Sequence, residues 1–272
     1  MKFWFSIFLL LIPFKAQAEQ FSTQPHGLIG AKRTFVDAWF FNLQEGSGLI
    51  ARGANNTADL LSGPAWVTGL HGNALSFAAA NSRAEIRNET NFDFMTLTST
   101  WTLIVVYKAQ KLLAGIIFSK TNTFSATGFY LQAESDATGD IALVINSGTG
   151  AKWVTPVIPL SRAAGGRWHV LIMDYHSHGT DGIASSNVDN AVLSTVKFSL
   201  DGVMLNRTTT FAGGIYEGPI ANDNLAVISG WDLGTSTSFN GTIDMVGIWR
   251  GEGKGQLSDG DHRMIATRIL GR

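Results

Sequence analysis

The segment 225–249, LAVISGWDLGTSTSFNGTIDMVGIW, constrains the fold more than any other part of this sequence. It predicts an apolar strand, a turn rich in Gly, Ser and Thr, and a second strand from Gly241 to Trp249. Alternate residues of a strand face opposite sides, and here both sets are largely apolar: Ile243, Met245, Gly247 and Trp249 in one, Thr242, Asp244, Val246 and Ile248 in the other. A strand with one side in water would alternate polar and apolar residues, so we expect this strand to lie between two layers.

The rest of the chain repeats short runs of aromatic and β-branched residues separated by turn residues, which is typical of an all-β protein. Charged residues make up only 15% of the sequence, and 30 glycines supply the turns. No linker or repeat divides the chain, so we predict one domain over residues 34–272. The formal net charge of −1 argues against an electrostatic nucleic-acid binder.

The sequence predicts a definite set of elements. Residues 51–65 are expected to form a loop with little regular structure, because Asn55-Asn56 and Gly63-Pro64 are turn formers. The Asp201-Gly202 pair predicts a tight hairpin, and Ser258 is the expected N-cap of a helix over 257–270. Strands are expected at 34–43, 72–77, 82–89, 100–108, 116–120, 128–133, 140–146 and 166–175, and the hairpin is expected over 197–205.

Several phrases resemble the laminin-G-like, concanavalin-A-like lectin and glucanase family of jelly-roll domains. They are FNGTIDMVGIW followed by LSDGDHRMI, GNALSF at 72–77, and the strand GRWHVLIMDY followed by the Asp201-Gly202 hairpin. The resemblance implies an all-β fold, a two-sheet antiparallel β-sandwich with a short C-terminal helix. It does not settle the activity, because this fold carries lectins, adhesins, glycosidases and polysaccharide lyases alike.

The first residues, 1–18, have the composition of a secretory signal peptide. Lys2 supplies the charge, Phe3 to Phe14 the apolar segment, and Ala16-Gln17-Ala18 a small-x-small cleavage site. We expect the mature chain to begin at Glu19 with a polar lead-in over 19–33, and an uncleaved anchor is the alternative. The sequence has no cysteine, which suits a secreted, cell-surface or periplasmic protein of bacterial or phage-related origin.

The most unusual stretch for binding is Ser82 to Glu89. In a strand, the charged side chains would share one face: Arg83, Glu85, Arg87 and Glu89. Such a face could hold sugar hydroxyls and carboxylates, because arginine offers a planar fork for bidentate contacts. The R-x-E-x-R pattern resembles one motif of alginate-lyase jelly rolls, whose other motifs we do not find. The alternative is a self-paired, solvent-exposed strand face that discourages aggregation.

Aromatic rings near turns are the other candidates for sugar binding. Trp153 follows Lys152, and Trp231 precedes Asp232, so both lie beside polar residues rather than inside apolar runs. An exposed ring beside polar donors grips a sugar face, and we take Trp153 and Trp231 as the two stacking candidates. The alternative is that this chain buries its tryptophans in the core.

Asp244 is the main metal candidate. A buried carboxylate is costly unless it is hydrogen-bonded, ion-paired or metal-bound. Resemblance to the glucanase relatives implies a structural Ca²⁺ at Asp244, and the alternative is that Asp244 accepts backbone N–H bonds of a neighbouring turn. Asp174, His176 and His178 are spaced like strand metal ligands, although the last two read as ordinary loop histidines.

The sequence therefore predicts an exported, non-catalytic binding module that recognises a glycan or a surface protein in adhesion or surface attachment. Hydrolysis needs two carboxylates across a cleft, and the nearest approach is Glu85 with Glu89, between which Arg87 favours the ionised forms. No catalytic residue is predicted. Two alternatives stay open: a polysaccharide lyase or hydrolase with diverged motifs, and a self-assembling surface protein.

Overall fold

The structure is a computed structural model. It describes residues 34–40, 44–45, 48–50, 52–53, 57–95, 99–109, 115–122, 127–133, 141–146, 151–157, 164–176, 196–211, 223–231, 238–251 and 256–272, and the strands at 34–53, 151–157 and 207–211 are described by their backbone pairing. The predicted signal peptide 1–18 and lead-in 19–33 lie outside these residues.

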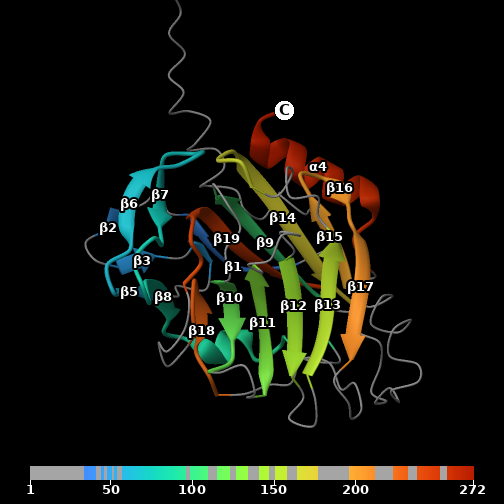
Figure 1. The fold of residues 1–272 in the computed structure, drawn as a ribbon, viewed down its shortest axis with the longest axis horizontal. Helices are drawn as coiled ribbons and strands as arrows, with labels where there is room; N and C mark the ends of the chain where they lie inside the picture. The colour runs from blue at the N-terminus through green and yellow to red at the C-terminus, as the bar shows by residue number, and fades with distance from the viewer. Residues whose placement is uncertain are drawn as a thin grey trace, which may run out of the picture.

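Two antiparallel sheets form the body of the molecule (Figure 1). In the described residues, sheet A has the order β16 (Val203–Met204), β15 (Val196–Leu200), β14 (Trp168–Tyr175), β9 (Trp101–Lys108), β19 (Thr242–Arg250), β1 (Thr34–Phe40) and β4 (Arg52–Gly53), with β7 (Asn73–Ser76) on β19 and β6 (Ala65–Thr68) on β7. Sheet B has the order β17 (Asn206–Phe211), β13 (Ala151–Val157), β12 (Ile141–Asn146), β11 (Gly128–Ala133), β10 (Gly115–Lys120), β18 (Ala226–Ile228), β8 (Arg83–Ile86), β5 (Thr57–Leu61), β3 (Gly48–Ile50) and β2 (Gln44–Glu45). The predicted all-β, two-sheet antiparallel sandwich is confirmed.

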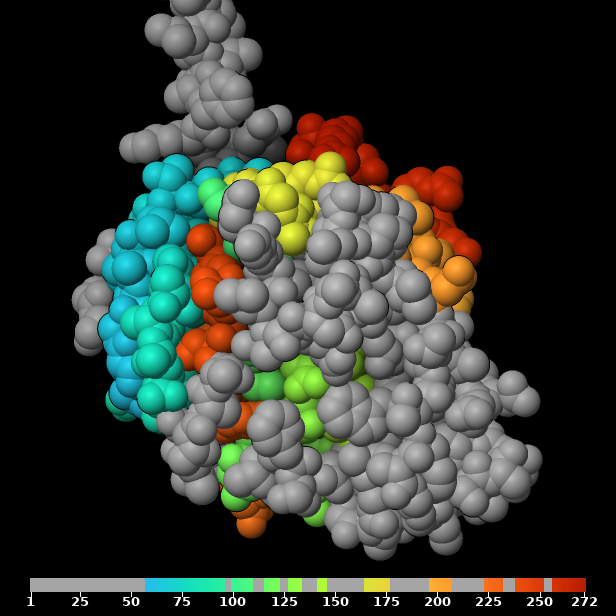
Figure 2. Space-filling model, viewed as in Figure 1, coloured from blue at the N-terminus to red at the C-terminus, as the bar shows by residue number. Residues whose placement is uncertain are grey.

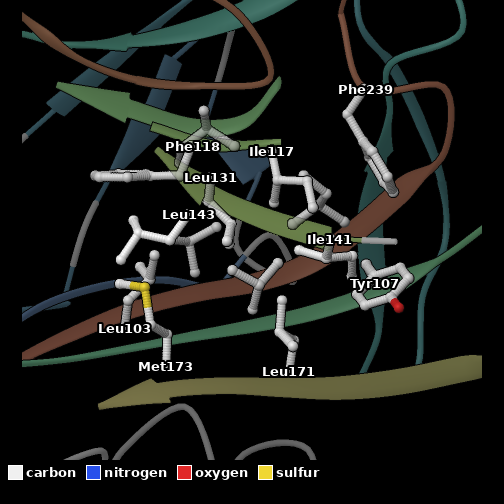
Figure 3. Packing of buried hydrophobic residues seen from close by; sticks show 14 of the residues in the cluster. Leu103, Tyr107, Ile117, Phe118, Leu131, Ile141, Leu143, Leu171, Met173 and Phe239 are labelled. Carbon is white, nitrogen blue, oxygen red and sulfur yellow. The ribbon is translucent and has the colours of Figure 1, made fainter. Parts of the chain in front are cut away.

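The main hydrophobic core fills the space between the sheets. In Figure 3, side chains of sheet A face those of sheet B, with Leu103, Tyr107, Leu171 and Met173 on one side and Phe118, Leu131 and Leu143 on the other. Each fully buried large apolar side chain contributes about 1.5–3 kcal/mol, so this layer supplies most of the drive to fold. The predicted central strand at 100–108 is confirmed, since β9 buries residues on both of its faces.

β19 lies between β9 and β1 in the middle of sheet A, as expected for a strand between two layers. Its register against β9 shifts between Ile243 and Met245 because Asp244 forms a β-bulge. The bulge places Ile243 in the main core with Val246, whereas Met245 lies on the other face of the sheet. The sequence alternation put Ile243 and Met245 on the same face, and that prediction is wrong because it allowed no extra residue.

The C-terminal helix α4 (Asp259–Leu270) covers the face of sheet A that points away from sheet B (Figure 1). Ser258 is its N-cap in a capping box with Asp261, as predicted for Ser258, and Gly271 ends it in the left-handed conformation. Its buried residues pack on a second cluster from sheet A that includes Ile104, Val106, Val170, Ile172, Met245 and Trp249. Sheet A thus lies between sheet B and α4, whereas the second face of sheet B points away from both sheet A and α4.

The Asp201-Gly202 turn is confirmed as the hairpin between β15 and β16, with φ of 53° and 79°. The Asp201 carboxylate also accepts the Val170 N–H at 2.9 Å and contacts His169 Nδ1 at 3.1 Å. Burial opposes ionisation of Asp201, yet these hydrogen bonds hold the pKa of its carboxyl below its usual value. His169 is fully buried with Ala164 O at 3.3 Å from Nε2, so it is a core residue.

Some element predictions are wrong. The expected loop at 51–65 contains β4 and β5, and β5 pairs with β8 inside sheet B. The expected strand 82–89 ends at Ile86, and a 3-10 helix, η3 (Glu89–Phe92), follows it. Because β8 has neighbours on both sides, its charged residues do not protect a sheet edge.

Candidate functional site

The site with the most candidate residues is the outer face of sheet B, the face turned away from sheet A. One row of cross-strand partners crosses this sheet: Asp59, Glu85, Val227, Ser119, Tyr130, Val144 and Trp153. Glu85 and Trp153 are therefore five strand spacings apart, roughly 24 Å at the usual spacing. The structure brings the predicted charged strand and Trp153 into one sheet and one row. The side chain of Trp153 lies outside what the structure describes.

The outward direction of the charged residues follows from the burial pattern of β8. Ala84 and Ile86 are fully buried in the main core, so Arg83 and Glu85 point to the opposite face. Arg83 Nε donates to Glu85 Oε1 at 2.6 Å, and Arg83 Nη1 donates to Asn81 O at 3.3 Å. The two side chains are 15% and 17% exposed, so this ion pair is partly desolvated and its geometry is restrained.

A second ion pair continues the charged end of the face. Arg87 donates two hydrogen bonds to Asp59 on β5, from Nε at 2.6 Å and from Nη2 at 2.7 Å. Hydrogen bonding and charge attraction by Asp59 raise the pKa of the Arg87 guanidinium. The pair is bidentate and open to water, with side-chain exposures of 64% and 42%. Sequence pattern did not point to Asp59, which lay in the segment expected to be a loop.

Glu89 does not belong to the charged face as predicted. It begins η3, and its carboxylate contacts Lys120 Nζ at 3.0 Å. Lys120 is 2% exposed and also donates to Asn224 O and contacts Asp93. This buried cation joins η3 to the end of β10, and its role is structural.

The turn Ser229–Trp231 follows β18 and lies against β10 and β11. Ser229 adopts a left-handed φ of 63°, an unusual conformation for a serine, and is fixed by its N–H bond to Ile117 O and its hydroxyl bond to Ser82 O. Gly230 lies against the Arg83 side chain, where an added Cβ would come 3.4 Å from the Arg83 Cβ. Figure 2 shows the blue-green atoms of 57–95 beside orange-red atoms of 223–251 on this face.

The prediction that the Trp231 ring is exposed is wrong. Trp231 is only 1% exposed and packs edge-on against Tyr130, with ring centroids 4.6 Å apart. Both rings belong to a small cluster with Ile116 and Val144. In this conformation the indole cannot stack on a sugar, because the ring is buried. Its partner Tyr130 comes from a strand about a hundred residues earlier, so the local sequence gives no sign of this contact.

Asp244 makes the backbone hydrogen bonds of the alternative prediction. Its Oδ1 accepts the Leu70 N–H at 2.7 Å and the His71 N–H at 3.3 Å, and Oδ2 lies 3.1 Å from His71 Nδ1. His71 Nε2 lies 2.8 Å from Ile269 O, and because a carbonyl only accepts, this nitrogen carries a proton. The contacts link β19, the 69–72 turn and the last turn of α4.

These contacts do not fit a calcium ion at Asp244. Calcium needs six to eight oxygen ligands, whereas the Asp244 oxygens face nitrogen donors on two sides. In the described part of the chain, no three His, Asp or Glu residues gather closely enough to hold a metal. Calcium binding itself stays a prediction, for which a chelator experiment is the test.

Two further polar groups carry candidate chemistry, and both are buried. Asp174 accepts hydrogen bonds from Thr102 Oγ1–H at 2.6 Å and from the Leu257 N–H at 2.7 Å. His178, which has the spacing of a metal ligand relative to Asp174, lies outside the described residues. Ser199 Oγ lies 2.8 Å from His262 Nδ1, but both residues are fully buried, so no substrate reaches this pair in this conformation. Burial lowers the pKa of His262.

The sequence matches no protein-family model and no curated protein. Among solved structures, it resembles domain 4 of AbnA, a GH43 extracellular arabinanase from Geobacillus stearothermophilus, in complex with arabinotriose, with a TM-score of 0.53 and 15% identity over 86% of this chain and 99% of that domain. It also resembles the binding domain of botulinum neurotoxin serotype D, with a TM-score of 0.57 and 11% identity over 86% of this chain. A third is the binding domain of botulinum neurotoxin DC in complex with rat synaptotagmin II, with a TM-score of 0.54 and 8% identity over 88% of this chain.

The chain spans about half of each neurotoxin binding domain, 50% and 52%, but nearly all of the arabinanase domain. At these identities the likeness is one of fold. Within the described residues, no helix has both the length and the apolar composition needed to cross a membrane. The comparisons thus agree with the topology: this chain has the fold of β-sandwich domains.

Proposed function

We propose that this chain is an exported carbohydrate-binding module, of the laminin-G-like or concanavalin-A-like kind, that attaches the protein or cell carrying it to a surface glycan. The observation that carries the proposal is the fold likeness to arabinanase domain 4, because it covers 99% of a domain that was solved with arabinotriose bound. About half of each neurotoxin domain matches this chain in fold, and those domains are named as binding domains.

We place the binding surface at the charged end of the outer face of sheet B. The charged side chains there, Asp59, Arg83, Glu85 and Arg87, are all reached by water at least in part. Carboxylate and guanidinium groups recognise hydroxyls by hydrogen bonds, and rigid polar groups on a sheet give such contacts their orientation. The restrained Arg83–Glu85 pair supplies that rigidity. Trp153 stays a separate aromatic candidate, because the row residues between it and Glu85, namely Val227, Ser119, Tyr130 and Val144, are buried.

The geometry supports binding better than hydrolysis. Glu85 and Glu89, the nearest approach to a carboxylate pair, are each bound to a different cation, Arg83 and Lys120. Hydrolysis needs two carboxylates that face each other across a cleft, whereas Glu85 lies on β8 and Glu89 begins η3 beside Lys120. The hydrolase with diverged motifs is therefore the weaker proposal, and the lyase stays the other enzymatic alternative.

Recognition of a surface protein is the second candidate function. The observation that favours it is the neurotoxin DC binding domain solved in complex with rat synaptotagmin II, about half of which matches this chain in fold. The two candidates differ in what competes for binding: a free oligosaccharide displaces a glycan target and leaves a protein contact intact.

A glycan array followed by calorimetry tests the proposal. We expect saturable binding to at least one oligosaccharide class, and we expect Asp59→Ala combined with Arg87→Ala to weaken it by at least about tenfold. Arg263→Ala on the exposed side of α4 is the matched control and should bind like the wild type. Melting curves confirm that each variant is folded. Binding to no glycan, or equal binding by the double variant, would refute the proposal.

A further inference from the structure

The arginines at the charged end of sheet B are already bound to carboxylates of the same face. Arg87 uses two donors of its fork on Asp59, at 2.6 and 2.7 Å. Arg83 uses Nε on Glu85 at 2.6 Å and Nη1 on Asn81 O. Asp59 thus occupies one edge of the Arg87 fork and already balances its charge, so a sugar carboxylate would meet only the remaining Nη edge of a guanidinium that is neutralised by the protein.

The charge of this surface leads to the same conclusion. Among the described outward residues of β5 and β8, with Arg87 just beyond, two arginines stand against two carboxylates, so the pairs cancel. The Coulomb attraction that draws an anion to a surface requires excess positive charge, which this end does not offer. An acidic sugar would instead meet the Asp59 carboxylate and Glu85 Oε2 at close range, and like charges repel.

Neutral sugars meet a different surface. A hydroxyl both donates and accepts, so it can donate to the free lone pairs of a paired carboxylate and accept from the remaining N–H groups of a paired guanidinium. Ion pairs fixed across β5 and β8 present both kinds of group side by side, without any net charge to be neutralised. The partial burial of Arg83 and Glu85 keeps these groups in place before the ligand arrives.

We infer that the charged end of sheet B selects neutral glycans and rejects uronate- and sialate-bearing ones. This inference rests on the proposed carbohydrate-binding function and names its ligand class. It also separates the chain from lyases of acidic polysaccharides, which the R-x-E-x-R pattern resembled: here each arginine serves a carboxylate of the protein rather than one of the substrate.

The test is an array of neutral and acidic oligosaccharides, including arabino-oligosaccharides and oligogalacturonates, probed with the full chain. We expect the hits to be neutral, and their dissociation constants to change less than about twofold between roughly 0.05 and 0.5 M NaCl. Hits that are mainly acidic, with binding that weakens steeply in salt, would overturn the inference and leave the proposed function standing. No hit of either kind would overturn the function and the inference with it.

A specificity switch makes the test independent of which glycan is bound. Asp59→Asn combined with Glu85→Gln keeps the shapes of the side chains and releases both arginines, so we expect a gain of about tenfold or more in affinity for oligogalacturonate, reversed by salt. Arg83→Gln combined with Arg87→Gln, which removes the cations, should show no such gain, and Arg263→Ala should match the wild type. If the first double variant gains nothing for acidic sugars while remaining folded, the pairing does not set the selectivity.

Discussion

Replacing Asp244 by alanine tests whether this carboxylate fastens the C-terminal helix to the sandwich by hydrogen bonds. Asp244 is 3% exposed and is the acceptor for the Leu70 N–H at 2.7 Å, the His71 N–H at 3.3 Å and the His71 ring at 3.1 Å. A hydrogen bond to a charged group contributes about 1.5–3 kcal/mol, and the longest of these contacts contributes least. We therefore expect Asp244→Ala to lower the free energy of unfolding by about 3 kcal/mol.

Asp244→Asn separates hydrogen bonding from charge. The asparagine oxygen can still accept from the Leu70 and His71 N–H groups, and its amide can donate to His71 Nδ1, since Nε2 carries the proton that faces Ile269 O. We expect a loss of only about 1 kcal/mol for this variant. Asp259→Asn, at an exposed carboxylate of the same region, is the control and should change stability by less than about 0.5 kcal/mol.

Calorimetry and urea unfolding provide the measurements. For a chain of this size, about 3 kcal/mol corresponds to a fall in melting temperature of roughly 6–12 °C, and the Asn variant should lose about a third of that. Adding EDTA should leave the wild-type melting temperature unchanged. The reasoning is refuted if the Ala and Asn variants are equally unstable, or if calcium stabilises the wild type and that stabilisation disappears in Asp244→Asn.

Three further predictions follow from the packing. Gly202→Ala should cost more than Gly63→Ala by about 1–3 kcal/mol in urea unfolding, because both have positive φ but only at Gly202 would a Cβ meet α4; equal costs would exclude the clash. Burial lowers the pKa of His262, so on acidification the unfolded chain binds a proton before the folded chain does. The free energy of unfolding should therefore have its full value above about pH 6.5 and decrease as the pH falls below it, and His262→Gln should flatten that part of the pH profile. Lys120→Met should cost about 3 kcal/mol by chemical denaturation, because it leaves Glu89 without its cation, whereas a loss under about 1 kcal/mol would show that water replaces the amine.

Most of the fold was predictable because it depends on local chemistry that the sequence displays. β9 was found from its continuous apolar run, the β15–β16 hairpin from its Asp-Gly turn, and α4 from Ser258 ahead of acidic residues. β5 was missed because turn formers surround it. What makes Thr57–Leu61 a strand is its pairing with β8, and no local residue pattern displays that.

The candidate site was predictable only in part. The alternation in Arg83–Ile86 correctly separated outward from inward residues, because a two-residue period is imposed by the strand itself. The partner of Arg87 was missed, because Asp59 lies on another strand. β-Bulges were missed as well: an extra residue at Ile117 puts both Ile117 and Phe118 in the core, and no residue type in the sequence marks it.

The burial of Trp231 shows the same limit at a functional level. Its neighbours Gly230 and Asp232 are turn formers, which is why exposure was expected. Instead, the ring packs against Tyr130 of another strand and is buried. A polar sequence around a tryptophan therefore indicates where the backbone turns, and it does not indicate which side of the ring another strand will cover.

The position of β19 has a consequence for how the chain reaches its native state. β19 spans Thr242–Arg250 yet pairs with both β9 and β1, so the middle of sheet A stays open until this late segment has been synthesised. Until then β9 and β1 present unpaired edges, and their joining requires closing a loop of about 130 residues or more, which is slow. During synthesis the nascent protein would thus need shielding from neighbouring chains, and a ribosome stalled before codon 242 would release an aggregation-prone product.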